Sequence, residues 1–121
     1  MANKSQSFRD VTVWQKAHAF TLHIYRCTEG FPKHELFALT SQLRRAAASI
    51  PSNFAEGFRK RTKPDKCRFY NIAQGSADEC LYQLILSNDL GYADTASLQA
   101  DLEEVSRLLQ GYINGLERAG S

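Results

Sequence analysis

The chain has 121 residues, of which 43% are hydrophobic and 23% are charged. This is the composition of an ordinary globular protein, and a chain of this length forms one domain with its own core. The longest apolar runs are too short to span a bilayer, and the first seven residues lack the apolar core of a signal peptide. We therefore expect a cytoplasmic protein whose cysteines stay reduced.

Apolar residues recur with helical spacing in four segments, which predicts an all-α fold: an up-down antiparallel four-helix bundle in a single domain, residues 1–121. Residues 1–10 are predicted to be a polar N-terminal tail. The first helix should span about 13–29, with a capping box formed by Thr12 and Gln15 at its start. Its predicted inward residues are Val13, Ala17, Phe20 and Ile24.

The second helix is predicted over about 35–61. Pro51 lies inside this pattern, where it removes a backbone hydrogen bond and crowds the carbonyl of Ala47. Because the apolar stripe continues in phase beyond the proline, we expect a kinked but continuous helix, with a full break at the proline as the alternative. The predicted inward residues are Leu36, Leu39, Leu43, Ala47, Ile50, Phe54 and Phe58.

The third helix is predicted over about 64–90, capped by Thr62, and the fourth over about 95–117. The third helix is apolar around much of its circumference, so we expect it to need burial on more than one side, with a subunit interface as the cover. Its apolar residues are Phe69, Tyr70, Ala73, Ala77, Cys80, Leu81, Leu84 and Ile85. Those of the fourth helix are Leu98, Leu102, Val105, Leu109, Tyr112, Ile113 and Leu116.

A line of polar residues lies beside the stripe of the second helix and continues on the third. This polar seam consists of Gln42, Arg45, Ser49, Asn53, Glu56, Ser76 and Glu79. Antiparallel pairing of the two helices predicts that Glu79 lies within reach of Arg44 or Arg45, and that Gly75 lies where the helices press together. Two interpretations are open: a satisfied polar network that sets the register of the helices, or a groove that grips a partner or RNA.

The net charge of +2 hides an asymmetry, because residues 1–68 carry 13 Lys and Arg against 5 Asp and Glu, whereas residues 69–121 carry 2 against 8. The basic residues that could contact phosphates are Arg44, Arg45, Arg59, Lys60, Arg61, Lys63, Lys66 and Arg68. The alternative is a solvated turn that faces the acidic part of a neighbouring subunit.

The sequence contains no catalytic or phosphate-binding motif, and its three histidines lack the spacing of a metal site. We therefore predict no catalytic residues, no metal and no cofactor. An enzyme on this scaffold would have Glu56, Glu79 and a histidine as its acid–base groups, and it is the least favoured of three hypotheses.

Four stretches form ordered motifs along the chain. They are 13–17 (VWQKA), 31–35 (FPxxE), 42–57 (QLRRAAxSIPxNxAEG) and 68–79 (RFxxIAxGSxxE). Together they resemble the four-helix-bundle family that includes the 23S rRNA intervening-sequence proteins. The resemblance implies a second helix that continues across Pro51 and self-association into a ring-shaped homopentamer.

The resemblance also implies a distant kinship with the accessory proteins of diversity-generating retroelements, which are basic pentamers that bind nucleic acid and a reverse transcriptase. This chain departs from that branch in its low net charge and its acidic second half. We therefore expect a non-enzymatic homo-oligomer that acts as an interaction or accessory module without contacting a membrane. The alternative is an RNA-binding accessory protein that uses the basic residues between 44 and 68.

Overall fold

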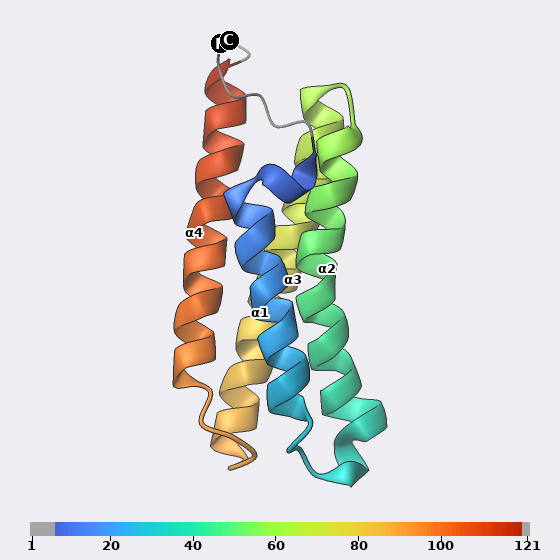
Figure 1. Ribbon diagram of the computed structural model, residues 1–121, viewed down its shortest axis with the longest axis vertical. Helices are drawn as coiled ribbons and strands as arrows, with labels where there is room; N and C mark the ends of the chain where they lie inside the picture. Colours follow the sequence, from blue (N-terminus) through green and yellow to red (C-terminus); the bar gives the residue numbers. More distant parts are fainter. Residues whose placement is uncertain (1–6, 120–121) are drawn as a thin grey trace.

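The computed structural model describes residues 7–119. Over this range the chain forms four α-helices and no strand. The helices are α1 (Thr12–Thr28), α2 (Ser41–Arg59), α3 (Lys63–Asp89) and α4 (Ala96–Ala119). They alternate in direction, and each packs against two neighbours in the order α1–α2–α3–α4–α1, which confirms the predicted up-down bundle (Figure 1).

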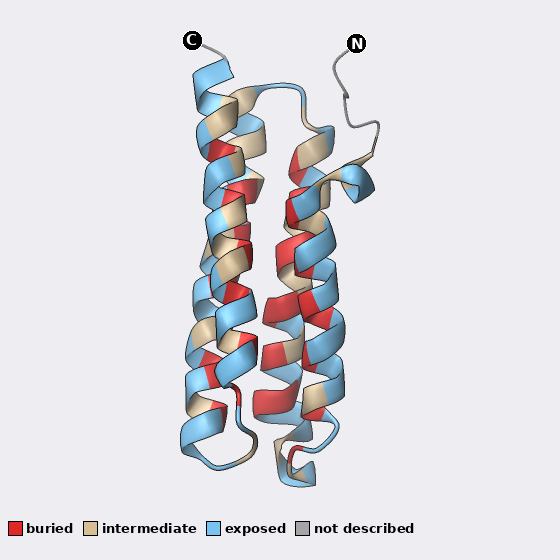
Figure 2. Ribbon diagram, turned by 60° about the vertical axis from the view of Figure 1, so that its left-hand side comes forward, coloured by how far each residue is buried: buried red, intermediate tan, exposed pale blue. Residues whose placement is uncertain are grey.

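One apolar core fills the space between the four helices. Each helix turns a single buried stripe inward and leaves its other faces half-buried or exposed (Figure 2). The largest fully buried side chains include Phe20, Ile24, Leu43, Ile50, Phe54, Tyr70, Leu84, Leu102 and Leu109. The inward faces predicted for α1 and α4 are confirmed, with Tyr112 and Leu116 partly buried at the edge of the core.

The predicted capping box of Thr12 and Gln15 is wrong. Val11 is the N-cap residue of α1, and no side chain caps this end. The Gln15 side chain instead donates from Nε2 to the carbonyl oxygen of Arg9, 2.8 Å away. Gln15 thus holds the preceding segment against α1 and does not reach back to Thr12.

Part of the predicted N-terminal tail forms a 3₁₀ helix, Phe8–Asp10. Ser7 and Asp10 cap it reciprocally, each side chain accepting a hydrogen bond from a backbone N–H of this turn. The ring of Phe8 packs edge-on against Trp14, with centroids 5.1 Å apart. Residues 1–6 of the predicted tail lie outside the described residues.

The predicted start of the second helix near Glu35 is also wrong. A 3₁₀ helix, Lys33–Glu35, is followed by a π-helical turn, Leu36–Thr40, before α2 begins at Ser41. Because a π turn holds an extra residue, it rotates the residues before it by about 100° relative to the α-helical stripe. Leu36, predicted to face the core, is therefore 46% exposed.

The carboxylate of Glu35 anchors this π turn. Its Oε1 accepts a hydrogen bond from the backbone N–H of Leu39 at 3.3 Å, and its Oε2 accepts one from the hydroxyl of Tyr92 at 2.7 Å. Since Tyr92 belongs to the connection between α3 and α4, Glu35 joins the two connections at the lower end of the bundle (Figure 1).

Acid is expected to loosen this lower end. The hydrogen bond from Tyr92, followed by that from Leu39, holds the pKa of Glu35 below its usual value. A carboxylate with a depressed folded-state pKa stabilises the folded protein above its unfolded pKa of about 4.3, and that contribution is lost as the pH falls through the folded-state pKa. Amide-exchange protection of residues 36–40 should therefore fall below about pH 4. In the Glu35→Gln variant the protection of these amides should already be lower at neutral pH, and it should not fall further below about pH 4. An equal fall in protection in both proteins would show that Glu35 does not anchor the π turn.

The predicted continuity of α2 across Pro51 is confirmed, and the proline itself is buried; the kink stays a prediction. Pro51 has no N–H to offer the carbonyl of Ala47, four residues earlier. The hydroxyl of Thr21 on α1 lies 3.2 Å from that carbonyl oxygen and 2.9 Å from the carbonyl oxygen of Ala17. A side chain of α1 thus supplies a donor where the proline removes one.

Thr21→Val is expected to destabilise the protein by about 1–2 kcal/mol, because it leaves the buried Ala47 carbonyl without this donor. In a Pro51→Ala background the N–H of residue 51 can bond the carbonyl, so the cost of Thr21→Val should be smaller. A double-mutant cycle by urea unfolding measures the difference. Equal costs in both backgrounds would show that Thr21 does not serve this carbonyl.

The predicted N-terminal cap of α3 is confirmed. The hydroxyl of Thr62 accepts a hydrogen bond from the N–H of Asp65 at 3.3 Å. Gly91 follows the helix with a φ of 77°, a left-handed conformation that favours glycine. The chain then passes through the buried Thr95 into α4.

Candidate functional site

The middle of the polar seam is a hydrogen-bonded network between α2 and α3. The hydroxyl oxygens of Ser49 and Ser76 lie 2.7 Å apart, one donating to the other. Asn53 donates from Nδ2 to the carbonyl oxygen of Ser49 at 2.8 Å and lies 2.9 Å from its hydroxyl. This part of the seam joins the two helices, as expected of a network that sets their register.

The upper and lower parts of the seam are open to solvent. Gln42, Arg45 and Glu79 line, together with Ser49 and Ser76, a hollow of about 210 Å³ between α2 and α3. Arg45 donates to Gln42 at 2.6 Å, and Glu79 accepts a hydrogen bond of 3.5 Å from Gln83. Over residues 7–119 Arg45 and Glu79 form no ion pair with one another. Glu56 is exposed and lies outside this hollow.

Of the two arginines predicted as alternatives near Glu79, Arg45 lines the same hollow as Glu79, and Arg44 turns towards α1. Its Nε donates to the hydroxyl of Thr28 at 2.8 Å, its Nη2 donates to the carbonyl oxygen of Tyr25 at 3.3 Å, and its guanidinium covers the Tyr25 ring at 4.7 Å. Arg44 therefore binds α1, because its flank of α2 faces α1 and the flank of Arg45 faces α3.

Gly75 does not lie where α2 and α3 press together. A Cβ atom built at Gly75 would meet no described atom within 4 Å, so this glycine faces open space. The close approach occurs at Gly57 instead, where a Cβ atom would lie 2.7 Å from the Tyr70 ring. The reason is geometric: Gly75 is on the outward side of α3, whereas Gly57 is on the inward side of α2.

The predicted basic residues form two separate groups. Arg44 and Arg45 lie near the start of α2, about 20 Å along the helix from Arg59. The second group, here called the basic turn, surrounds the connection between α2 and α3 at the upper end of the bundle (Figure 1). It consists of Arg59, Lys60, Arg61, Lys63, Lys66 and Arg68.

Several cations of the basic turn also have structural contacts. Lys66 donates to the carbonyl oxygens of Gly57 and Phe58, which caps the end of α2, and burial lowers the pKa of its ammonium group. Lys60 and Arg68 both approach the ring of Phe69, at 5.1 and 5.0 Å from its centroid. None of the six cations forms an ion pair with a carboxylate in the part of the chain that the structure describes.

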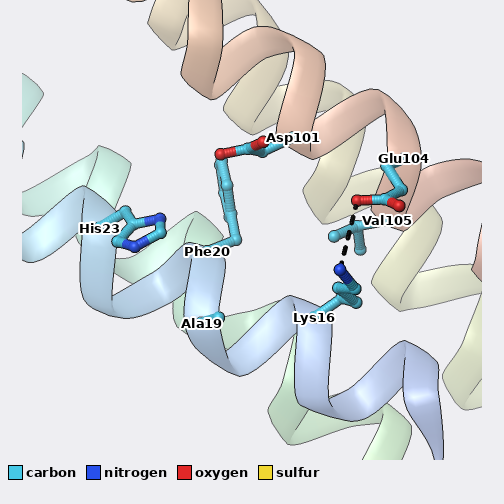
Figure 3. Close-up of a pocket in the computed structure, with 7 residues that line it drawn as sticks. All are labelled: Lys16, Ala19, Phe20, His23, Asp101, Glu104 and Val105. Carbon is cyan, nitrogen blue, oxygen red and sulfur yellow. Dashed lines mark ion pairs between the residues drawn. The ribbon is translucent and has the colours of Figure 1, made fainter.

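A small charged hollow lies between α1 and α4 (Figure 3). Lys16 forms an ion pair with Glu104 at 3.9 Å there, and His23 and Asp101 line the same space. Its volume is about 120 Å³, well below the 300–1,000 Å³ or so that is typical of small-molecule sites. Because both charges of the ion pair are about half exposed, the pair contributes little to stability.

Burial makes the thiols of Cys27 and Cys80 harder to ionise. Burial, with a smaller contribution from the charge of Glu79, raises the pKa of Cys80 to about 12. Burial also raises the pKa of Cys27. Within residues 7–119 no group of three or more His, Cys, Asp or Glu side chains is placed to hold a metal ion. The described helices include none with the length and apolar character needed to cross a membrane.

Two surfaces of the described chain carry exposed large apolar side chains. One is formed around the π turn, where Phe37 is 92% exposed and lines a hollow with Tyr25, Leu36 and Arg44. The other is the outward side of α3, the helix whose sequence predicts burial on more than one side. Phe37 could not be assigned from periodicity, because its exposure depends on the π turn that displaces it from the α-helical phase.

Comparison with known proteins identifies the family. A family profile described as "23S rRNA-intervening sequence protein" matches residues 9–111. The chain belongs to the 23S rRNA-intervening sequence protein family. The match spans all four motifs noted in the sequence, so the resemblance drawn from them is confirmed. No curated protein sequence is a significant match.

A solved structure shares the fold of this 23S rRNA-intervening sequence protein. It is the crystal structure of a protein with unknown function from the S23 ribosomal protein family of Bacteroides thetaiotaomicron. The two chains superpose with a TM-score of 0.76 at 26% identity, over 84% of this chain and 98% of the other. The bundle is therefore shared along almost the whole length of that protein.

Proposed function

We propose that this protein is a non-enzymatic, self-associating helical bundle of the cytoplasm that acts as an interaction or accessory module. The observation that carries the proposal is the apolar surface that the single chain leaves uncovered. The exposed large hydrophobic side chains include Phe37, Ile72, Tyr82, Ile85 and Leu90.

The third helix contributes most to this uncovered apolar surface. Its inward side is buried in the core, and its outward side carries Ile72, Tyr82 and Ile85 at 48, 62 and 40% exposure. Exposed apolar groups that gather on one face mark interaction surfaces, whereas scattered ones do not. A second copy of the chain would cover this face, which agrees with the homopentamer implied by the family resemblance.

The residues that line the hollows support a non-enzymatic role. The space around Glu79 is lined by Gln42, Arg45, Ala46, Ser49 and Ser76, and the histidines of α1 lie on other faces. General acid–base chemistry needs a group within hydrogen-bond reach of its partner, and here Glu79 is paired with Gln83 alone among the described side chains.

Sedimentation equilibrium over a range of concentrations tests the proposal. We expect an assembly of several chains to persist at about 10 μM, because interfaces of 1,200–2,000 Å² give affinities in the micromolar range or tighter. A single species with the mass of one chain at that concentration would contradict the proposal. Adding moderate salt should leave the assembly largely intact, since burial of apolar surface depends weakly on ionic strength.

A second candidate function is RNA binding at the basic turn, supported by six cations without carboxylate partners among the described residues. Arg59 and Arg61 are exposed, and neither forms an ion pair with another described residue. Cations of this kind contact phosphates and give affinity without reading the sequence.

The salt dependence of RNA binding decides this candidate. If four of the cations contact phosphates, the logarithm of the binding constant should fall by about 3 for each tenfold rise in salt. The variant Arg59→Ala/Arg61→Ala should reduce this slope by about 1.5, and the variant Arg44→Ala/Arg45→Ala, on the distant group, should leave it unchanged. Binding that does not depend on salt, or equal slopes for both variants, would remove the hypothesis.

A further inference from the structure

An open groove runs along the outside of the α1–α2 pair. Its floor consists of small side chains of α2, namely Ala48, Ser52 and Ala55, and its wall consists of Trp14 and His18 of α1. The hollow they enclose has a volume of about 320 Å³. Small residues allow another backbone to approach closely, so this part of the surface has the shape of a seat for a helix.

A second, separate hollow of about 410 Å³ lies towards the lower end of the bundle and is lined by Tyr25, Arg44 and Phe37. The Arg44 side chain donates to Thr28 and covers the Tyr25 ring, so it crosses from α2 to α1 here. From Trp14 to Tyr25 the two hollows together extend about 17 Å along α1, at 1.5 Å per residue. We call this surface, from Trp14 to Phe37, the α1–α2 groove.

The outward side of α3 carries exposed apolar residues over a similar length. Tyr82 lies at its centre, and Ile72 and Ile85 lie on either side of it, about 80° and 60° away around the helix and within about 20 Å along it. Gly75 lies between them with open space where a side chain would be. We call this surface, from Ile72 to Ile85, the α3 ridge.

The two surfaces also carry opposite charge. The flank of α2 that carries Ala48, Ser52 and Ala55 also carries Arg44 before them and Arg59 after them. Between Ile72 and Ile85 the exposed side of α3 carries the carboxylate of Asp78 and no lysine or arginine. Opposite charges across an interface steer the partners together and set their register.

We propose that the α3 ridge of one copy of this chain lies in the α1–α2 groove of the next. This inference rests on the proposed self-association and assigns its surfaces. Because α1 lies in front of α3 in the bundle, the groove and the ridge face different directions and cannot meet within one chain (Figure 1). The contact is therefore heterologous: each added copy presents a new groove and a new ridge, and the assembly closes into a ring or extends as a filament.

Two variants with one defective surface each test the assignment. The groove variant, Ser52→Glu/Ala55→Glu, places carboxylates opposite the acidic ridge. The ridge variant, Ile72→Glu/Tyr82→Glu, removes the apolar anchors, and all four positions are exposed or half-exposed, so the fold should be retained. Each variant alone should weaken assembly at least tenfold and sediment as a monomer at about 10 μM.

Mixing the two variants gives the decisive result. The intact ridge of one and the intact groove of the other should form a one-to-one dimer and nothing larger. The matched control is Ala100→Glu, at an exposed alanine of α4 outside both surfaces; this variant should assemble like the unmodified chain. If a double variant fails to fold by circular dichroism, Ser52→Glu and Tyr82→Glu alone replace it.

The outcomes separate this inference from the proposed function. An unmodified chain that assembles, together with variants that assemble equally well or stay monomeric when mixed, would overturn the groove-to-ridge contact and leave self-association standing. A monomeric unmodified chain would overturn both the self-association and the groove-to-ridge contact. Formation of the dimer when the two variants are mixed supports both claims.

Discussion

Gly57→Ala is expected to destabilise the protein by about 2–3 kcal/mol, although alanine is the better helix former. The new Cβ atom would lie 2.7 Å from Cε1 of Tyr70 and 3.0 Å from the Cβ atom of Phe69. The Tyr70 ring cannot swing away, because it is fully buried and stacks on Phe54 with centroids 5.1 Å apart. The helices α2 and α3 would have to separate locally, which weakens the most extensive helix contact of the bundle.

Urea unfolding followed by circular dichroism measures this effect. The matched control is Gly111→Ala on α4, where a Cβ atom would meet no described atom within 4 Å. There the better helix propensity of alanine should act alone and stabilise the protein by up to about 1 kcal/mol. If Gly57→Ala were as stabilising as its control, the close contact between α2 and α3 would be wrong.

Phe54→Ala is expected to cost about 3–5 kcal/mol, the largest effect of a single truncation predicted for this core. Phe54 is 1% exposed and is the centre of an aromatic cluster near the upper end of the bundle. Its ring stacks on Tyr70 and meets Tyr112 edge-on, with both pairs of centroids 5.1 Å apart. Truncation removes these contacts and leaves a cavity that the neighbouring rings cannot fill without leaving their positions.

Phe37→Ala provides the same chemical change on the surface. Since Phe37 is 92% exposed, its truncation should change the free energy of unfolding by less than about 0.5 kcal/mol when measured in the monomeric ridge variant. In the otherwise unmodified chain it should weaken assembly, because Phe37 lines the lower hollow of the α1–α2 groove. A large loss of monomer stability would show that Phe37 is part of the core.

The helices and their inward faces could be predicted from the sequence because burial repeats along a helix with a fixed period. The contact between Ser49 and Ser76 follows from the same period together with the antiparallel pairing of α2 and α3, and the structure places their hydroxyls 2.7 Å apart. Helical periodicity and the antiparallel pairing of two consecutive helices are enough to predict a contact between those two helices.

The π turn could not be predicted in this way. It is anchored by Glu35, whose partner Tyr92 is 57 residues away in the sequence. The choice between Arg44 and Arg45 as the neighbour of Glu79 was left open for a related reason. The flank of α2 that carries Arg44 faces α1, and the sequence pattern does not show which neighbouring helix lies on which side. Contacts distant in the sequence, and not local propensity, decide these features.

The division of the basic residues into two groups follows from the predicted continuous helix, which separates residues 44 and 59 by about 20 Å. The structure confirms that helix. The basic turn gathers six of the eight predicted cations at one end of the bundle, and RNA binding is proposed for these six. Arg44 and Arg45 instead serve the α1 contact and the hollow between α2 and α3.

Native mass spectrometry of the unmodified protein tests the central claim most directly, because it counts the copies that bury the apolar surface of α3 and the π turn. Each chain has a mass of 13.6 kDa, and we predict that the main species contains several of them, with about 68 kDa for the five copies that the family resemblance implies. A spectrum with only the single 13.6-kDa chain at micromolar concentration would contradict the account.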